Sequence, residues 1–263
     1  MSSETSPLTD AVVVSHVSFG YNRDEKLILD DITLSIPSGT ITAVLGPNGV
    51  GKTTLLNLLL RWLIPITGTI HLCGGESSNY SRREMGTLIS LVPQDEHIPF
   101  EYTLLDYVLL GRAPHLSPLQ APGPEDIRVA RFGLDRVGLG ALAHQPVSEI
   151  SGGEKQLAMI ARSLTQAPRI LLIDEGSAHL DLKNRRHLVD VLHQLRDEGI
   201  TVICTTHDPD FASAAAEQMV LLHQGRLLSA GPLAAVMTEK NLQNVFDIPL
   251  KLASVGDRKI VIW

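Results

Sequence analysis

Eight consecutive residues between two apolar segments have the composition of a phosphate-binding loop. They follow the pattern Gly-x-x-x-x-Gly-Lys-Thr and read Gly46-Pro47-Asn48-Gly49-Val50-Gly51-Lys52-Thr53, followed by Thr54. Glycines let successive backbone N–H groups converge on phosphate oxygens, and the positive end of a following helix faces the same anion. In this pattern the lysine reaches the β- and γ-phosphates, and the Thr hydroxyl binds Mg²⁺. The loop therefore predicts nucleotide binding.

Two adjacent carboxylates, Asp174 and Glu175, follow the apolar run Ile170–Ile173. Ligands bind open α/β sheets at the carboxyl ends of the strands, so a strand that delivers two carboxylates there completes a phosphate site. Asp174 would hold Mg²⁺, usually through water, and Glu175 would orient or deprotonate the attacking water. A solvated strand end can carry the same pair of residues. The phosphate-binding loop favours hydrolysis over that alternative.

A second candidate anion site lies at the start of a predicted amphipathic helix. Apolar residues at Leu157, Ile160, Ala161 and Leu164 recur with the period of one helical face. The run that opens this helix reads Ser151-Gly152-Gly153-Glu154. Serine is a favoured N-cap, and the free N–H groups of a first helical turn attract anions. One chain therefore offers two places for phosphate.

The elements that position these residues are predicted to alternate between strands and helices. Runs rich in β-branched residues predict strands in the first third, at Ala11–Val17, Ile32–Ile36, Ile41–Leu45, Thr69–Leu72 and Leu88–Val92. Nearly continuous apolar runs predict buried parallel strands at Ile170–Ile173, Ile200–Thr205 and Met219–Leu222. Helical spacing from Leu188 to Leu195 precedes one of these strands and indicates a doubly wound α/β fold. The middle third is predicted to be helical, with a surface loop at Ala113–Pro124.

Composition restricts the class of protein. The chain has 263 residues, of which 44% are hydrophobic and 19% charged, which is enough for a full hydrophobic core. The formal net charge is −7, and Lys and Arg form no stripe, so nucleic acid is not an expected partner. The polar first ten residues lack the features of a secretory signal, and the segment Leu55–Ile66 is too short to span a bilayer. We therefore expect a cytoplasmic protein whose membrane partner, if any, is a separate chain. Cys73 and Cys204 are interpreted as structural.

The chain resembles the ATP-binding cassette (ABC) ATPase family over nearly its whole length. The run Ile150 to Gln156 matches the family's Ser-Gly-Gly signature, with Ile where Leu is more usual. The other family elements follow in order, as Tyr21 after Phe19-Gly20, Gln94 after Val92-Pro93, and His207 after Thr205-Thr206. The resemblance implies that Tyr21 stacks on adenine, that Gln94 links the metal site to a membrane partner, and that His207 contacts the γ-phosphate beside Glu175.

The resemblance also implies a fold and an assembly. The fold would be a P-loop core with a mainly parallel sheet, an antiparallel β subdomain and an inserted helical subdomain. Within one unit spanning 1–263, we expect the core at about 11–95 and 167–235, the helical part at about 96–166 and a C-terminal extension at about 236–263. Two copies would sandwich two molecules of ATP, with the signature of one copy clamping the ATP bound to the other.

One segment departs from the family pattern. After Glu175 the family usually has Pro-Thr-Ser, whereas this chain has Gly176-Ser177-Ala178. The substitution of glycine for proline predicts a more flexible loop. Asp181 still matches the aspartate that crosses the dimer interface in the family. Communication between the two ATP sites is the property that this departure would alter.

Two further segments favour an importer of metal chelates, of the iron-siderophore, haem or cobalamin type. They are Thr103–Leu116 and Leu242–Leu252, and both resemble the ATPases of such importers. The resemblance implies a separate integral-membrane permease, an indirect link to a substrate-binding protein, and a position at the cytoplasmic face of the membrane. ATPases of zinc, manganese or molybdate importers use related segments and stay open as alternatives. A soluble ABC ATPase without a transport role also stays open, as does a nucleotide-dependent regulatory module that hydrolyses little.

The loop after Gln94 is acidic, with Asp95, Glu96 and Glu101. In the family this loop lies near the permease. One hypothesis is that these carboxylates meet basic residues of the permease. A solvated acidic loop without a partner is the alternative.

Overall fold

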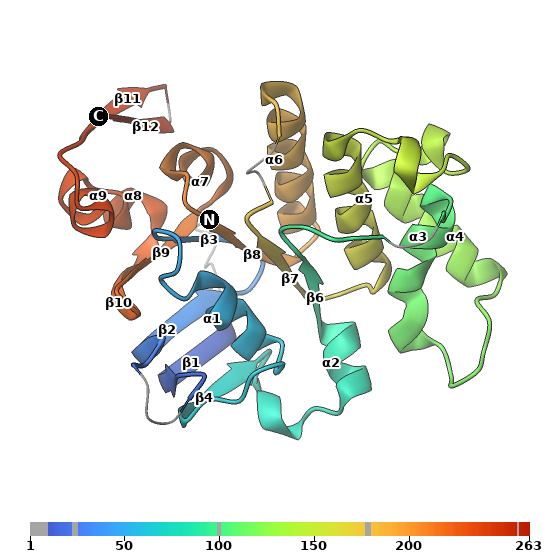
Figure 1. Cartoon of the computed structure of the whole chain (residues 1–263), viewed down its shortest axis with the longest axis horizontal. Helices are drawn as coiled ribbons and strands as arrows, with labels where there is room; N and C mark the ends of the chain where they lie inside the picture. The colour runs from blue at the N-terminus through green and yellow to red at the C-terminus, as the bar shows by residue number, and fades with distance from the viewer. Residues whose placement is uncertain (1–9, 23–25, 99–100, 177–179, 257) are drawn as a thin grey trace, which may run out of the picture.

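The computed structural model describes residues 10–22, 26–98, 101–176, 180–256 and 258–263. Its centre is a six-stranded sheet in the order β10-β9-β3-β8-β7-β6, in which only β10 runs antiparallel to its neighbour (Figure 1). The strands are β3 (Ile41–Leu45), β6 (Ile89–Val92), β7 (Ile170–Asp174), β8 (Thr201–Thr206), β9 (Gln218–His223) and β10 (Arg226–Pro232). Every residue of β3, β7 and β8 is buried, as their apolar sequences predict for strands covered on both faces.

A second sheet is antiparallel and has the order β2-β1-β4-β5. Its strands are β1 (Asp10–Phe19), β2 (Leu29–Pro37), β4 (Thr67–Leu72) and β5 (Gly75–Glu76). Helix α1 (Lys52–Leu59) buries Leu55, Leu56, Leu58 and Leu59 in one apolar cluster with residues of both sheets. This packing explains why α1 is apolar on most of its circumference, since it is covered from two sides.

Three helices form a separate layer at one end of the molecule, to the right in Figure 1. They are α3 (Leu104–Leu109), α4 (Pro124–Arg136) and α5 (Gly152–Thr165), and they pack against one another. The 3₁₀ turns η2 (Leu110–His115), η3 (Gly140–Leu142) and η4 (Val147–Glu149) connect them. The predicted loop Ala113–Pro124 is therefore too long at both ends. It starts inside η2, and Pro124 is the first residue of α4, where its missing N–H costs nothing.

Of the remaining helices, η1 packs against β4 of the antiparallel sheet, and the others pack against strands of the six-stranded sheet. They are η1 (Ser77–Asn79), α2 (Arg82–Leu88), α6 (Leu182–Asp197), α7 (Pro209–Ala215), α8 (Leu233–Val236) and α9 (Glu239–Phe246). The chain ends in the antiparallel pair β11 (Lys251–Val255) and β12 (Arg258–Ile262), which we call the carboxyl-terminal hairpin. Sequence reasoning missed α2 and the hairpin. Leu88, predicted as a strand residue, ends α2 instead. None of the described helices is long and apolar enough to cross a membrane.

Candidate functional site

The loop Gly46–Thr53 connects the carboxyl end of β3 to the first turn of α1. Two of its glycines are required by the geometry. A Cβ on Gly46 would lie 2.6 Å from the carbonyl oxygen of Leu222, and Gly51 has a φ of +107° at the N-cap of α1. The backbone can therefore turn tightly here and present its N–H groups to the space above the helix.

Lys52 is the first residue of α1, and its ammonium group reaches back over the loop. Its Nζ donates to the carbonyl oxygens of Gly46 at 2.9 Å and Pro47 at 3.2 Å. The same nitrogen forms an ion pair with Oε1 of Glu175 at 3.2 Å, and the side chain is 5% exposed. This buried cation lies where a phosphate approaching the loop would meet it.

Asp174, the last residue of β7, has a hydroxyl group on each carboxylate oxygen. Oδ2 accepts a hydrogen bond from Thr53 Oγ1 at 2.8 Å, and Oδ1 accepts one from Thr205 Oγ1. The aspartate is 6% exposed. Hydroxyl and carboxylate oxygens are hard ligands that suit Mg²⁺, which also keeps waters and phosphate oxygens in its shell. Within the described ranges no three His, Cys, Asp or Glu residues come together in a way that could hold a metal on their own. The donor set thus fits a metal that is shared with a nucleotide.

Glu175 has an unusual backbone conformation and three polar partners. Its φ of +48° is in the left-handed region, which costs energy in a residue other than glycine. Besides the ion pair with Lys52, its carboxylate lies 3.3 Å from Nδ1 of His207 and 3.5 Å from Nε2 of Gln94. The four predicted catalytic residues therefore meet at one carboxylate.

Thr205 joins the two carboxylates and was missed by sequence reasoning. Its hydroxyl donates to Asp174 and accepts the backbone N–H of Glu175 at 3.0 Å, and the residue is 1% exposed. The hydrogen bond to the N–H fixes the backbone at the strained position of Glu175. A signal was present, because Thr205 is a polar residue at the carboxyl end of a buried parallel strand, where ligand sites form.

Lys52, Thr53 and Glu175 face a cavity of about 390 Å³ above the loop. The residues that line it are Tyr21, Ile28, Asn48, Gly49, Gly51, Lys52, Thr53, Thr54, Gln94 and Glu175. The ring of Tyr21 packs edge-on against Phe19, with centroids 5.2 Å apart and planes at 85°, and is 63% exposed. An exposed aromatic face at the rim of a phosphate cavity can stack on a planar base. Ile28, an apolar neighbour in the lining, was not predicted.

The second predicted anion site is well formed but is not part of this cavity. Ser151 is the N-cap of α5, and its hydroxyl accepts the N–H of Glu154 while the Glu154 carboxylate accepts the N–H of Ser151 at 2.8 Å. The Ser151 hydroxyl also donates to Oε2 of Glu154 at 2.7 Å, and this bond, followed by the one from the Ser151 backbone N–H, lowers the pKa of Glu154 below its usual value. Asp181 caps α6 in a similar way, through the N–H of Asn184 at 2.8 Å. Gly153 lies against Asn184, because a Cβ there would be 2.3 Å from Nδ2.

The described lining of the cavity thus combines Tyr21, Gly49, Gly51–Thr54, Gln94 and Glu175 but includes neither Ser151–Glu154 nor Asp181. Gly46 and Pro47 adjoin the cavity through Lys52, and Val50 is buried below the loop. Asp174 adjoins it through Thr53, and His207 through Glu175. The phosphate-binding loop and the signature are therefore two separate surfaces of one chain.

The model of the ABC transporter family matches residues 29–178. The chain belongs to the ABC transporter family. The "Probable iron chelatin transport ATP-binding protein" of Helicobacter pylori is 36% identical over 252 residues, which cover 95% of this chain and 98% of that protein. The molybdate import ATP-binding protein MolC of Haemophilus influenzae is 34% identical and covers 92% of this chain and 90% of its own length. The family match and these relatives together indicate that the chain is an ATPase coupled to transport.

Solved structures share the ABC ATPase fold. A chain from an inward-facing ABC transporter assigned to the metal-chelate type superposes with a TM-score of 0.84 at 32% identity, covering 96% of both chains. A dimeric post-hydrolysis ATP-binding cassette with ADP and phosphate superposes with a TM-score of 0.74 at 27% identity, covering 84% of this chain and 98% of that one. The predicted mainly parallel core, antiparallel sheet and inserted helices are confirmed.

The departure after Glu175 has a partial structural explanation in this ABC chain. A Cβ on Gly176 would lie 2.5 Å from Cγ2 of Ile173 and 3.1 Å from Nε2 of Gln156. A side chain therefore has no room at Gly176, and the expected flexibility of the loop stays a prediction. Residues 177–179, to which the expectation also applies, lie outside the described residues.

Two carboxylates of the acidic loop have ion pairs within the ABC chain. Glu96 forms an ion pair with Arg162 and accepts a hydrogen bond from the hydroxyl of Tyr107 at 2.8 Å. Asp95 lies 3.6 Å from the ammonium group of Lys155. These pairs tie the loop after Gln94 to α3 and α5. The side chain of Asp95 is nevertheless 89% exposed and Glu101 is exposed, so the contact with basic residues of a partner stays a prediction.

Proposed function

We propose that two copies of this ABC cassette close on two molecules of ATP and that hydrolysis reopens them. Each ATP would lie between the loop Gly46–Thr53 of one copy and Ser151–Gly153 of the other, with Asp181 at the interface. The observation that carries the proposal is the separation of these two phosphate-binding surfaces within one chain, because a chain that cannot close its own site needs a second copy. The solved dimer of a similar cassette supports this arrangement.

The residues around Glu175 support a division of tasks. Lys52 would bind the β- and γ-phosphates, and its departure from Glu175 would free that carboxylate to accept a proton from water. His207 and Gln94, which contact the same carboxylate, would orient it and the γ-phosphate. Tyr21 would stack on adenine. Because Lys52 pairs with Glu175, a phosphate that competes for the lysine would make this carboxylate available as a base.

Thr53 and Asp174 would hold Mg²⁺, with Gln94 near its coordination shell. When bound, this ion would spread the negative charge of the terminal phosphates. The hydroxyl of Thr53 would then turn from Asp174 toward the metal. Thr205 would keep the other carboxylate oxygen of Asp174 in place during that change.

The partner would be an integral-membrane permease at the cytoplasmic face of the membrane. A groove of about 1130 Å³ separates α2 from α5 and has β6 at its base. We call it the α2–α5 groove. Pro93 and Glu96, on both sides of Gln94, line it, so a partner in the groove would lie beside the residue that contacts Glu175. This connection supports the groove as the permease site.

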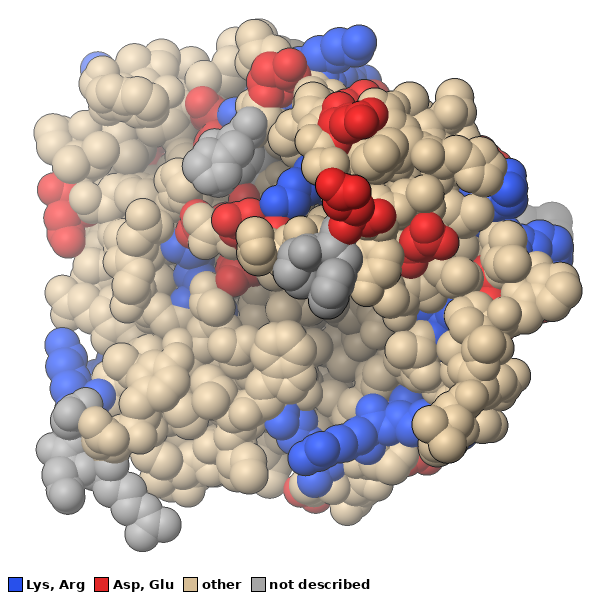
Figure 2. Space-filling model, turned by 45° about the vertical axis from the view of Figure 1, so that its right-hand side comes forward, with Lys and Arg blue, Asp and Glu red and all other residues tan. Residues whose placement is uncertain are grey.

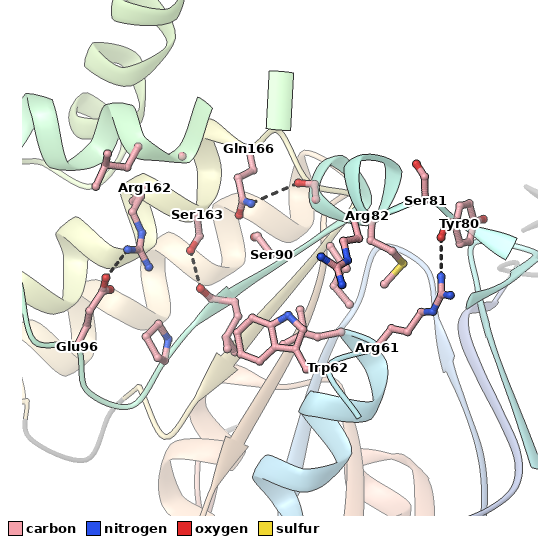
Figure 3. A pocket seen from close by; sticks show the side chains of 18 of the residues that line it. Arg61, Trp62, Tyr80, Ser81, Arg82, Ser90, Glu96, Arg162, Ser163 and Gln166 are labelled. Carbon is pink, nitrogen blue, oxygen red and sulfur yellow. Dashed lines mark hydrogen bonds and ion pairs between the residues drawn. The ribbon is translucent and has the colours of Figure 1, made fainter. Parts of the chain in front are cut away.

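Charges and apolar side chains of the groove indicate which permease segment would fit. Figure 3 shows Arg61, Trp62 and Arg82 on the side of the groove opposite Arg162. Trp62 is 67% exposed, and Ile64 is 77% exposed. Arg61 donates only to backbone carbonyl groups, and Arg82 has no polar partner among the described residues. Figure 2 shows Lys and Arg side chains along the lower edge of the hollowed face. A segment with an apolar face and an acidic residue would therefore fit, in contrast to the basic segment predicted from the loop.

The cargo we propose is a metal chelate, delivered by a substrate-binding protein that reaches the cassette only through the permease. The iron chelatin relative and the metal-chelate transporter structure support it. The molybdate relative is nearly as similar, and the ATPase never contacts the cargo. Uptake assays with the permease would decide between iron chelates and oxyanions.

The central test is the substitution Glu175→Gln. We expect it to leave ATP binding intact, to reduce kcat by about 10² to 10⁴, and to prolong the ATP-bound dimer. Steady-state phosphate release and size-exclusion chromatography in ATP measure the two effects. Glu198→Gln, at the exposed end of α6, is the matched control. Undiminished turnover of the Glu175 variant would remove Glu175 from its proposed role.

The groove has its own test. In the assembled complex with its permease, Arg82→Glu should weaken association and Arg82→Lys should preserve it, because only the first reverses the charge. Co-purification of the two subunits at increasing salt measures the effect. Equal association of both variants would contradict an acidic partner segment.

A further inference from the structure

The carboxyl-terminal hairpin packs directly on α7, the helix that follows His207. The two elements lie side by side at the end of the molecule opposite to α3–α5 (Figure 1). Val261 of β12 is 7% exposed and belongs to the same apolar cluster as Phe211, Ala212 and Ala215 of α7. Hydrophobic burial therefore holds the hairpin against the helix.

Two hydrogen bonds define how the hairpin sits on α7. The backbone N–H of Val261 donates to Oδ1 of Asp210 at 2.9 Å, and the backbone N–H of Lys259 donates to Oγ of Ser213 at 3.0 Å. Both N–H groups lie on the edge of β12 that faces away from β11. Asp210 is in the first turn of α7, and Ser213 lies one turn further on. The bond to the carboxylate is charge-assisted and is the stronger of the two.

The hairpin is itself fixed to the rest of the molecule. Nζ of Lys259 donates to the carbonyl oxygens of Met237 at 2.6 Å and Ala234 at 3.2 Å, beside α8. On the other strand the N–H of Leu252 donates to Oε1 of Glu239, in α9, at 2.8 Å. The hairpin thus connects α7 to α8 and α9 and can restrain the helix rather than move freely with it.

His207 depends on its backbone for its position. The imidazole is 48% exposed, and its one polar contact within the described chain is the Glu175 carboxylate. The next residue, Asp208, caps α7 by accepting the N–H groups of Asp210 at 2.8 Å and Phe211 at 3.0 Å. A rotation of the first turn of α7 would therefore shift the cap and the histidine together.

We propose that the carboxyl-terminal hairpin holds the first turn of α7 through Asp210 and thereby positions His207 for ATP hydrolysis. Asp210 is a positioning residue, because it touches neither nucleotide nor Glu175 and acts through the backbone that leads to His207. The inference rests on the role proposed above for His207. The residues that affect ATP hydrolysis would then include those of the carboxyl-terminal hairpin.

Asp208 also connects α7 to α6, the helix that begins at Asp181 of the proposed dimer interface. The second carboxylate oxygen of Asp208 forms an ion pair with Arg185 of α6 at 2.6 Å. The N–H of Arg185 donates to the carbonyl oxygen of Asp181, the N-cap of α6. Asp208 therefore joins the helix held by the hairpin to the helix that begins at Asp181.

The test compares three variants of the full chain. Asp210→Ala removes the acceptor for Val261, Asp210→Asn keeps an acceptor oxygen, and Ser213→Ala removes the neighbouring bond of the same hairpin. We expect Asp210→Ala to lower kcat on the order of tenfold with KM for ATP changed less than about twofold, as a small displacement of a reacting group does. Asp210→Asn should recover most of this loss, and Ser213→Ala should keep kcat close to that of the wild type.

Thermal unfolding of the same variants separates positioning from general stability. Wild-type kcat in Asp210→Ala would overturn the inference, as would an equal loss of kcat in Ser213→Ala. His207→Ala distinguishes the role of the histidine from the role of the hairpin. If that variant is inactive while Asp210→Ala is fully active, only the link through the hairpin fails. If His207→Ala hydrolyses ATP normally, the role of the histidine fails and the inference falls with it.

Discussion

Among the polar atoms behind the two carboxylates, the hydroxyl of Thr205 should contribute most to the free energy of unfolding. Replacing Thr205 by Val keeps the shape of the side chain and removes the hydroxyl. Asp174 then loses a donor in an almost dry site, and the backbone N–H of Glu175 loses its acceptor. The two catalytic carboxylates would no longer share an anchor.

The magnitude follows from these two bonds. A hydrogen bond to a charged group contributes about 1.5–3 kcal/mol, and a buried N–H without an acceptor adds about 1 kcal/mol, so Thr205→Val should cost about 3 kcal/mol. For a chain of this size each kcal/mol lowers Tm by about 2 °C, which predicts a decrease of about 6 °C. We also expect kcat to fall on the order of tenfold, because Asp174 and Glu175 can both shift.

The neighbouring strand provides a matched control. Thr42 in β3 is 1% exposed, and its hydroxyl has no hydrogen-bond partner among the described residues. Thr42→Val should therefore leave the free energy of unfolding unchanged or raise it by about 1 kcal/mol. Calorimetry and steady-state ATPase assays on both variants measure the difference. If Thr205→Val is as stable and as active as Thr42→Val, the argument that one hydroxyl anchors both carboxylates is refuted.

Two further predictions concern the signature helix. Gly153→Ala should lower Tm of the isolated chain because its Cβ must displace Asn184, whereas Gly152→Ala, which has open space, should be neutral or slightly stabilising; equal Tm values would contradict this packing. The lowered pKa of Glu154 means that its contribution to the cap is complete above the ordinary pKa of glutamate and is lost as the pH falls through the lowered value. Glu154→Gln should therefore remove part of the acid dependence of unfolding, which pH-dependent denaturation would detect, and an unchanged acid midpoint would contradict it.

The central sheet and the phosphate-binding loop could be predicted because each is determined by residues that are adjacent in the sequence. Runs such as Ile170–Ile173 are apolar enough to require burial on both faces, and the loop needs glycine where the backbone approaches Leu222. The roles of Tyr21, Gln94 and His207 came from resemblance, since each residue alone would be interpreted as a surface or strand residue. Their assigned roles stay predictions.

Other features depend on contacts between distant residues and leave little trace in the sequence. Thr205 is marked in the sequence only as a polar residue at the end of a buried strand, and its role as an anchor depends on the pairing of β7 with β8, which brings Asp174 and Glu175 beside it. In the sequence the acidic loop has no Lys or Arg nearby to pair with Glu96. Its ion-pair partner, Arg162, lies 66 residues further along the chain. Helix α2 is only seven residues long and is held by its capping box, a signal too short to stand out from a loop.

The carboxyl-terminal hairpin also affects how copies of the chain behave in solution. A two-stranded sheet has two free edges, and unpaired N–H groups on such edges can recruit strands from other molecules. Here the outward N–H groups of Lys259 and Val261 are bonded to side chains of α7, and that of Leu252 is bonded to Glu239. Side chains of neighbouring helices therefore occupy the outward N–H groups of Lys259 and Val261 on β12 and that of Leu252 on β11. These contacts oppose strand-by-strand pairing of the hairpin with other molecules at the edge of β12.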